Sequence, residues 1–354
     1  MFAHQAVATD FVFIFGLFTV FGCAFGAFLT VNYTLNFLIN KAESCTEDDQ
    51  NMIGELTLIF STLAFLTNSI IVTVLLYHHK KLNVMLSFIL NLLVLDGIFA
   101  LFGATFRGPG IINKDFYQMN AVTRALCPML PYFITWVPPL CSLAIFLITV
   151  DRYIAIRRPL NYASIMTPTA CFSLIAVTWV VQLIKFSVEL YLDMNSDILT
   201  ERYDPTLKRC EFDSKTYIFV LHIFYYLLPC FFMCLLYIGI FYEIWKSANS
   251  RKIMKRDNVV RKREESVKRR VKIIVTLSLI TVGFFVAWFP YFYSLAESVL
   301  FGISRPGFKV TIVMFYFNLL WDSVVYAIRT PLIYRMLLNC LFNRRIVNSN
   351  SRSR

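Results

Sequence analysis

Charged residues are scarce in this chain. They make up 16% of its 354 residues, against about 25% in soluble domains, whereas hydrophobic residues make up 58%. This balance excludes a disordered chain, a soluble nucleic-acid-binding domain and an ordinary cytosolic enzyme. The nine cysteines form no C-x-x-C pair and the four histidines form no H-x-x-x-H pair, so no zinc site is expected. The H-E-x-x-H and G-x-S-x-G motifs are also missing, and no enzyme is predicted.

Long apolar segments are abundant instead. A helix that crosses a membrane needs about 20 mostly apolar residues. Eight segments meet this length, and no long polar domain separates them. They lie roughly at 11–31, 55–77, 84–106, 121–153, 168–192, 217–243, 269–297 and 309–329. Because lipid forces backbone groups to pair within a helix, the sequence predicts an all-α membrane protein.

The charges of the links predict the orientation. The first set of links holds 21 Lys and Arg and three acids; it comprises 78–83, 154–168, 244–272 and 330–354. The opposite set holds eight Lys and Arg and eleven acids; it comprises 32–54, 107–120, 193–216 and 298–308. Basic links stay in the cytoplasm, so the first set is predicted to be cytoplasmic. The net charge of +12 is then an orientation signal and no sign of nucleic acid.

The chain divides into three parts on this reading. Residues 1–54 hold an apolar segment and an extracellular tail, 55–329 hold seven spans, and 330–354 form a cytoplasmic end. The segment 11–31 is either a signal peptide cut after Gly26 or a retained extra span. Ala24 and Gly26 supply the small residues of a cleavage site, whereas the long apolar run and the lack of a preceding Lys or Arg favour a retained span, so both readings stay open. The tail is predicted to lie outside from about residue 32, where Asn32 begins the sequon Asn-Tyr-Thr and is a glycosylation candidate.

A motif at the end of the third span points to a family. Asp151, Arg152 and Tyr153 resemble the D-R-Y motif of rhodopsin-like (class A) G-protein-coupled receptors. Landmarks of the other spans fall at that family's spacings over about 55–343. They are Asn68, Asn91, Asp96, Cys127, Trp179, Pro229, Tyr237, Phe284, Trp288, Pro290, Tyr291, Asn318 and Tyr326. The resemblance implies a seven-helix bundle in the plasma membrane, with an extracellular ligand, a heterotrimeric G protein and arrestin as partners.

The resemblance also implies a switch. Arg152 would leave Asp151 on activation and meet the G protein and Tyr237, while Trp288 would floor the ligand pocket and move with Phe284. Tyr153, Pro290 and Tyr326 complete the predicted set of switch residues. The family often places an acid where this chain has Arg270, so a weaker resting restraint and ligand-independent signalling are expected.

A polar site is implied in the middle of the bundle. The family binds a sodium ion there, and the matching residues are Asp96, Cys141, Asn318 and Asp322. Two carboxylates would repel each other in such a cavity, and a sodium ion or a shared proton would relieve this. No other metal or cofactor is predicted. Ser323 replaces the family's proline, and the pair Pro138 and Pro139 is expected to distort the third span.

The ligand is predicted mainly by exclusion. Aminergic receptors carry an aspartate where this chain has Ile134, and opsins carry a lysine where it has Tyr316. A peptide or a non-aminergic small molecule is therefore expected. The predicted pocket residues are Ile134, Thr135, Pro138, Trp288, Tyr291 and Tyr316. Lys185 and Glu189, four residues apart, are either part of this pocket or a pair at the membrane interface.

Two cysteine predictions remain. The resemblance implies a disulfide between Cys127 and Cys210, both extracellular by the charge pattern. Cys340 follows a short amphipathic segment that resembles an eighth helix along the membrane, and it is either lipidated or a free thiol.

The basic link 244–272 is expected to attract membrane lipid and the G protein. A transporter is the competing class, although the chain shows no internal repeat. A receptor-fold protein without G-protein signalling is a further alternative.

Overall fold

The structure is a computed structural model in which long helices run side by side. It describes residues 47–77, 83–113, 115–116, 119, 121–126, 130–194, 203–204, 209–210, 216–249, 275–291 and 308–341. Five of the described helices are long and apolar enough to cross a membrane, and two further apolar stretches, Leu228–Ile244 and Val275–Tyr291, are shorter. These seven fall on the seven spans predicted from residue 55 onward, and the prediction of a helical membrane bundle is confirmed.

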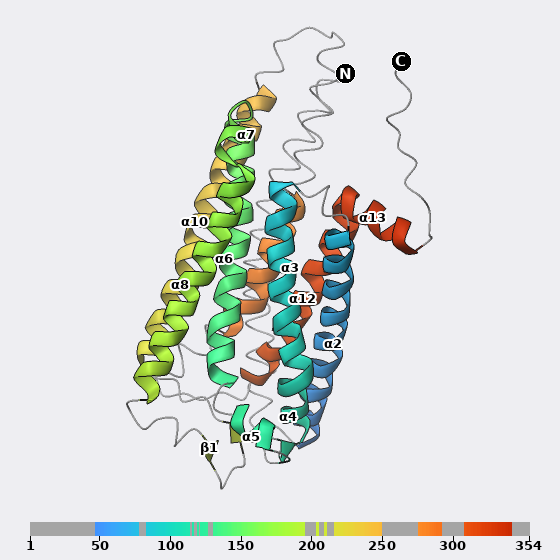
Figure 1. Ribbon diagram of the computed structural model, residues 1–354, viewed down its shortest axis with the longest axis vertical. Helices are drawn as coiled ribbons and strands as arrows, with labels where there is room; N and C mark the ends of the chain where they lie inside the picture. The colour runs from blue at the N-terminus through green and yellow to red at the C-terminus, as the bar shows by residue number, and fades with distance from the viewer. Residues whose placement is uncertain are drawn as a thin grey trace.

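The bundle has two ends, which lie at the top and at the bottom of Figure 1. The α4 end carries α4, α5 and β1, and the α7 end carries α7 and α13 (Figure 1). By the charge pattern, the α7 end is the predicted cytoplasmic side. The long helices are α2 (Glu47–Tyr77), α3 (Val84–Phe102), α6 (Leu130–Arg157), α8 (Pro168–Met194), α10 (Thr216–Asn249), Val275–Tyr291 and α12 (Phe308–Arg329). The short elements are α4 (Gly108–Ile112), α5 (Ala121–Leu126), α7 (Tyr162–Ile165), β1 (Tyr203–Asp204), β2 (Arg209–Cys210) and α13 (Pro331–Leu341).

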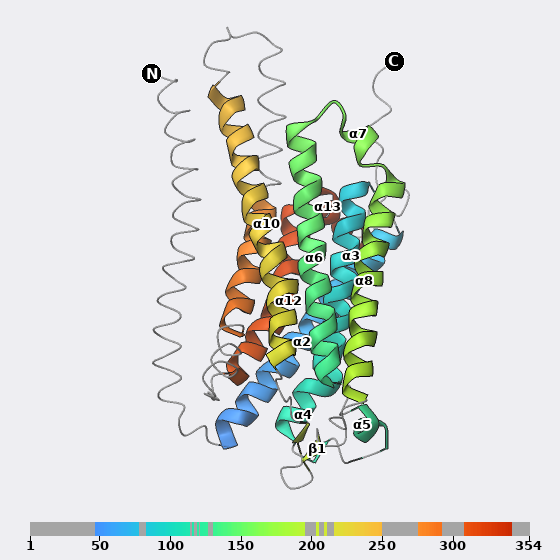
Figure 2. The same cartoon turned by 90° about the vertical axis from the view of Figure 1, so that its left-hand side faces the viewer.

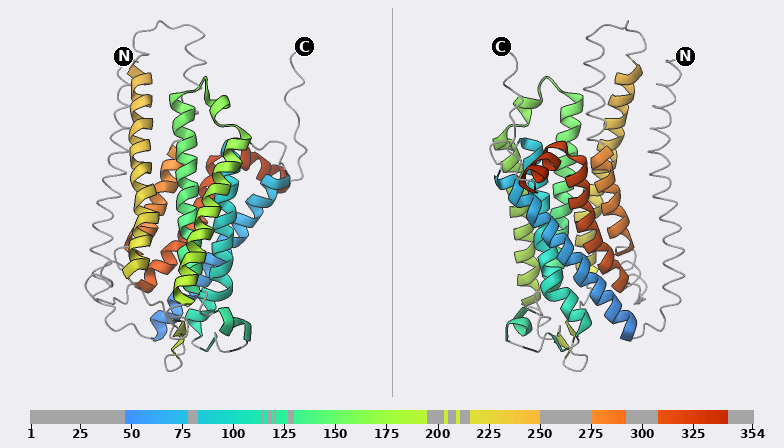
Figure 3. Two further views of the ribbon diagram at one scale, coloured as in Figure 1. Left: turned by 60° about the vertical axis from the view of Figure 1, so that its left-hand side comes forward. Right: turned by 90° about the vertical axis from the view of Figure 1, so that its right-hand side faces the viewer.

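Neighbouring helices are not always neighbours in the sequence. The helix α2 packs against both α3 and α12, and α6 packs against α3, α8 and α10. Figure 3 shows α12 running beside α2, with α13 turning away from the bundle at the α7 end. Figure 2 shows α7 where the chain passes from α6 to α8. The first and last of the long helices that the structure describes, α2 and α12, are thus neighbours.

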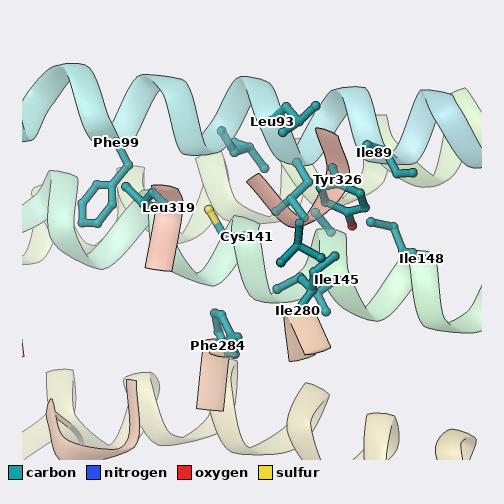
Figure 4. Close-up of a cluster of buried hydrophobic side chains, with 14 of the residues drawn as sticks. Ile89, Leu93, Phe99, Cys141, Ile145, Ile148, Ile280, Phe284, Leu319 and Tyr326 are labelled. Carbon is teal, nitrogen blue, oxygen red and sulfur yellow. The ribbon is translucent and has the colours of Figure 1, made fainter. Parts of the chain in front are cut away.

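The core lies where four helices meet. Figure 4 shows side chains of α3, α6, α12 and Val275–Tyr291 gathered there, among them Phe99, Ile145, Ile280 and Leu319. These four side chains are at most 3% exposed. Large apolar side chains on the outer face of α8 are exposed instead, as expected for a surface that lipid covers. They include Val177, Val180, Ile184 and Val188.

The third span begins later than predicted. Helix α6 starts at Leu130, and residues 121–126 form the separate helix α5. Proline fits the first turn of a helix, because the N–H donor that it lacks has no partner there. Pro128 follows α5, whereas Pro131 stands in the first turn of α6, where proline is tolerated. Pro138 and Pro139 lie inside α6, which continues past both to Arg157.

The second span contains a turn that was not predicted. It continues past residue 106 to Ile112, and residues Gly103–Arg107 form a π-helical segment, η3. The backbone N–H of Gly108 donates to the carbonyl of Gly103, five residues back, which is the wide spacing of a π-turn. The all-α prediction also omitted one small feature. Strands β1 and β2 form an antiparallel pair, with Tyr203 opposite Cys210.

The predicted eighth helix is present as α13. Ile333 and Met336 are buried on one side of it, whereas Tyr334 and Arg335 are exposed on the other. It packs against α2 and α12. The segment 11–31 and Asn32 lie outside the described residues.

Candidate functional site

The D-R-Y residues form a closed cluster at the α7 end. Asp151 is fully buried in the last turns of α6. The Nε of Arg152 donates to its Oδ2 at 2.8 Å, and a second guanidinium nitrogen pairs with the same oxygen. The hydroxyl of Tyr162, in α7, donates to the other carboxylate oxygen at 2.6 Å. We call Asp151, Arg152 and Tyr162 the arginine cluster.

Tyr162 is a neutral donor in this cluster. Burial, followed by its hydrogen bond to Asp151, raises the pKa of the Tyr162 hydroxyl well above its usual range. The phenol therefore keeps its proton at any physiological pH. Each oxygen of the Asp151 carboxylate thus has its own donor, and both donors hold the carboxylate in place.

Tyr153 points to a different neighbour. Its ring lies against α10 at Gly239, where an added Cβ would come within 2.7 Å of the tyrosine Cε2. Tyr153 and Ile156 pack against the buried pair Tyr237 and Ile240 of α10. The third residue of the motif thus fastens α6 to α10, whereas the first two form the arginine cluster.

The fifth and sixth spans are joined close by. The side-chain oxygens of Tyr237 and Thr281 lie 2.9 Å apart, and both residues are buried. Tyr326, on α12, is 1% exposed, and its hydroxyl has no hydrogen-bond partner among the described residues. Tyr237 is close enough to Tyr326 to interact with it electrostatically. The structure therefore brings these two predicted switch residues together.

Trp288 lies in a group of stacked rings between the helices. Its ring centroid is 3.9 Å from that of Phe315, 5.8 Å from Phe284 and 6.3 Å from Tyr291. The ring of Tyr316 stacks on Phe99 at 5.4 Å. Three of the predicted pocket residues, Trp288, Tyr291 and Tyr316, therefore lie together. Pro138 is buried on α6. The side chains of Ile134 and Thr135 are not among those that the structure describes.

The rings of α3 were missed at the sequence level. Phe99 and Phe102 extend the group of rings toward the α4 end, and Phe102 stacks on Phe133 of α6 at 4.4 Å. Asp96, Phe99 and Phe102 follow one another at intervals of three residues, a spacing that places them on one face of a helix and could have been seen in the sequence. We call the whole group the aromatic cluster. Its members are Phe99, Phe102, Phe133, Trp288, Tyr291, Phe315 and Tyr316.

The predicted ion-site residues also converge. The thiol of Cys141 donates to Asp96 Oδ1 at 3.5 Å, and Asp322 interacts electrostatically with Asp96. All three side chains are at most 4% exposed. One oxygen of each carboxylate, Asp96 Oδ2 and Asp322 Oδ1, has no hydrogen-bond partner in the described part of the chain. Asn318 is buried one turn before Asp322 on α12.

Polar contacts hold the helices around this site. The amide nitrogen of Asn68 donates to the carbonyls of Ala64 and Leu319, at 2.8 Å and 3.3 Å. The indole N–H of Trp179 donates to Asn91 at 3.0 Å and so joins α8 to α3. These landmark residues therefore connect helices.

Lys185 and Glu189 form an ion pair inside the bundle. Their charged atoms lie 2.9 Å apart, and each side chain is 4% exposed. A pair at the membrane interface would be exposed to water, so the burial favours the bundle interior.

Several predicted sites fall on residues or side chains outside the described part of the chain. Cys127, Asn32 and Arg270 lie outside the described residues, as do the side chains of Cys210 and Cys340. The predicted disulfide, glycosylation and lipidation therefore stay predictions. Among the described residues, no group of three or more His, Cys, Asp or Glu side chains is arranged to hold a metal ion.

Known proteins match most of the chain. The model of the 7 transmembrane receptor (rhodopsin family) matches residues 67–334. The human histamine H2 receptor is 28% identical over 224 residues, which is 60% of this chain and 59% of the relative. The octopamine receptor beta-2R of Chilo suppressalis is 24% identical over 340 residues, 85% of this chain and 84% of the relative.

A third relative matches a shorter stretch. The olfactory receptor 1073 of Rattus norvegicus is 32% identical over 93 residues, 26% of this chain and 30% of the relative. The chain spans about three fifths of the length of the histamine receptor it matches. With the family model covering more than half of the chain, this multi-pass membrane protein belongs to the rhodopsin family of seven-transmembrane receptors, which are receptors and not enzymes.

Proposed function

We propose that this protein is a plasma-membrane receptor that binds an extracellular ligand and activates a heterotrimeric G protein. The observation that carries this proposal is the arginine cluster. Arg152 is held by its neighbour Asp151, which is held in turn by Tyr162. Such a cluster can open without unfolding the bundle, because its bonds are few and lie at one end. Its opening would release a guanidinium for a partner protein at the cytoplasmic side.

The bond between Tyr237 and Thr281 supplies the second part of the mechanism. It joins α10 to the helix Val275–Tyr291 at 2.9 Å. If the cytoplasmic ends of these helices move apart, this bond breaks and the Tyr237 hydroxyl becomes available to Arg152. The Trp288 ring belongs to the same helix as Thr281. A ligand that shifts Trp288 would therefore act on that bond through one rigid element.

The ligand is proposed to be a peptide or a non-aminergic small molecule. Two of the relatives are named for amines, histamine and octopamine. This chain, however, carries Ile134 where aminergic receptors carry an aspartate. A protonated amine would then lack a carboxylate partner in an apolar site, which is costly.

Sodium is proposed as an allosteric ion. The free oxygens of Asp96 and Asp322 fit a hard cation, since such ions prefer oxygen ligands. Those two carboxylates and the Asn318 amide would hold the ion, and its charge would offset the repulsion between the carboxylates. Cys141 fits less well than the family's serine, because sulfur is a soft ligand. The thiol instead serves Asp96 as a donor.

The test is nucleotide exchange on purified G proteins, with membranes that contain the receptor. Candidate peptides and lipids are added in turn, and exchange without ligand is recorded as well, because Arg270 predicts basal activity. Arg152→Ala should remove most of the exchange. Arg158→Ala, at an exposed arginine six residues on, is the matched control and should lower it less than about twofold.

The alternatives have distinct outcomes. Ligand binding with no exchange on any G protein would favour a receptor fold without this signalling. Ligand uptake into vesicles without exchange would favour a transporter. Arrestin recruitment after ligand addition would support the second proposed partner.

A further inference from the structure

We propose that Arg107 recognises an acidic group of the ligand, so that the receptor's ligand is an organic anion with an apolar or aromatic body. This inference rests on the proposed function, because it names the ligand class of the same pocket. Arg107 is the last residue of η3, at the α4 end of the second span. The guanidinium is near enough to interact electrostatically with the hydroxyl of Tyr291, a member of the aromatic cluster.

The π-turn determines where Arg107 lies. A π-turn contains one residue more than an α-turn, so it rotates the residues that follow it, and such turns are frequent at functional sites. The turn begins at Gly103, where the Tyr316 ring approaches so closely that an added Cβ would lie 2.2 Å from its Cε1. The ring of Tyr316 therefore packs directly against the start of the π-turn. Arg107 comes one residue before α4 as a result.

Aromatic residues lie next to Arg107 in the sequence and near it in the fold. Phe106, the preceding residue, lies 5.9 Å from Phe102 between ring centroids, and Phe102 stacks on Phe133. Together with Tyr291, on the helix Val275–Tyr291, these rings make this end of the bundle apolar and aromatic. A cation in such surroundings is expensive unless it has a partner, and such a residue is a functional candidate by default.

The Arg107 side chain has an unused donor. Among the described residues, its buried Nε has no hydrogen-bond partner, and no carboxylate lies within ion-pair distance of the guanidinium. Leaving a buried donor unpaired costs free energy, and more so when it is charged. The side chain as a whole is only partly buried, so a ligand that enters from the α4 end can reach it.

The chemistry of the arginine selects the ligand. A guanidinium presents a planar fork of donors that matches a carboxylate or a phosphate with two parallel hydrogen bonds. The same charge repels an ammonium group. This chain has Ile134 where aminergic receptors carry an aspartate, so no carboxylate at that position offsets the repulsion. The rings then favour a body that is aromatic or aliphatic. An organic carboxylate satisfies both requirements, and a phosphate monoester shares its chemistry.

The test uses matched probes on the purified full-length receptor in detergent. One series is phenylacetate, phenylacetamide and phenethylamine, and another is octanoate, octanamide and octylamine; each keeps its body and changes only the charge. Phenyl phosphate distinguishes a phosphate source from a carboxylate. The readouts are the thermal midpoint Tm and the Kd from titration, neither of which needs a G protein.

The proposal expects the anionic member of each series to raise Tm most. In Arg107→Gln its Kd should rise about tenfold or more, because a charge-assisted hydrogen bond is lost. Arg107→Lys keeps the positive charge but not the planar fork of donors, so its Kd for the anion should lie between those of the wild type and Arg107→Gln. Arg335→Gln, at an exposed arginine of α13, is the matched control and should bind as the wild type does.

Two results would overturn the proposal. One is that the anions bind the wild type no better than the amides or amines. The other is that Arg107→Gln keeps its affinity for the anions within about twofold. If Arg107→Gln does not fold, the ranking on the wild type and on Arg107→Lys decides. Anion binding that depends on Arg107 but causes no nucleotide exchange would instead contradict the proposed signalling and leave this site intact.

Discussion

The side-chain oxygens of Thr67 in α2 and Ser323 in α12 lie 2.9 Å apart. Each hydroxyl also lies 2.9 Å from a carbonyl of its own helix, that of Leu63 for Thr67 and that of Leu320 for Ser323. Because a hydroxyl has one proton, the one that donates across the helices gives up its intrahelical bond while the other keeps its own. Ser323 stands where the family carries a proline. The substitution therefore returns a backbone donor to the seventh span and adds a polar link to the first.

Ser323→Ala should lower the free energy of unfolding by about 1 kcal/mol, because the link between the two helices is lost. The double variant Thr67→Ala with Ser323→Ala should cost less than the sum of the single variants, because they remove one shared bond. Thermal unfolding of the purified receptor measures both. Ser187→Ala is the control, since that exposed hydroxyl bonds only the carbonyl of Leu183 in its own helix. Additive costs would show that the contact does not stabilise the protein.

Tyr162→Phe should raise nucleotide exchange in the absence of ligand, by about threefold to tenfold. The change leaves one oxygen of the buried Asp151 without its donor, and this penalty falls on the state in which the arginine cluster is closed. The raised pKa of the Tyr162 hydroxyl adds a second expectation. The phenol does not ionise between pH 6 and about pH 9, so this contact should make basal exchange no more pH-dependent in the wild type than in Tyr162→Phe. Unchanged basal exchange at equal surface expression would contradict the role of Tyr162.

Thr281→Val should also raise basal exchange, by about twofold to tenfold. Valine keeps the shape of threonine but cannot bond the Tyr237 hydroxyl, and a hydrogen bond of this kind contributes about 0.5–1.5 kcal/mol. Thr178→Val removes a hydroxyl that bonds only within α8 and serves as the control. Lower basal exchange in Thr281→Val would mean that the bond belongs to the active state.

Asp322→Asn should reduce the response of signalling to sodium. The free oxygens of Asp96 and Asp322 are the proposed ligands, and an amide replaces one of these charges. Exchange is measured in sodium chloride and in choline chloride at equal ionic strength, and the difference should shrink at least about twofold. Glu55→Gln, at an exposed acid of α2, should leave the difference unchanged. A full sodium response in Asp322→Asn would remove Asp322 from the site.

The sequence predicted the bundle because lipid imposes one rule on every span, and runs of about 20 apolar residues satisfy it visibly. It also located residues whose spacing is itself the signal, such as Asp151, Trp288 and Tyr326. It missed η3, since a π-turn depends on how closely the Tyr316 ring approaches Gly103 from another helix. It missed Arg107 for a related reason: the residue was counted in a link, and only the folded turn brings it near Tyr291. The partner of Ser323 was equally hidden, as Thr67 lies 256 residues away.

Two glycines of the second span give the sharpest test of that close approach. An added Cβ at Gly103 would lie 2.2 Å from the Tyr316 ring and 2.9 Å from the Ser61 Cβ, whereas among the described residues one at Gly97 would meet only the Asn68 Cβ, at 3.8 Å. Gly103→Ala should therefore destabilise the receptor by about 1–3 kcal/mol through overpacking. Gly97→Ala should be neutral or stabilise it by up to about 1 kcal/mol, because alanine favours a helix.

Tyr316→Ala supplies the control for this pair. With the ring removed, the added methyl group at position 103 still meets the Ser61 Cβ, at 2.9 Å, but no longer the closer ring atoms, so Gly103→Ala should cost less in that background than in the wild type. Thermal unfolding of the four variants gives the coupling free energy between the two positions. Equal costs for Gly103→Ala with and without the Tyr316 ring would show that the methyl group meets some other obstacle. The ring would then not be what requires glycine at the start of η3.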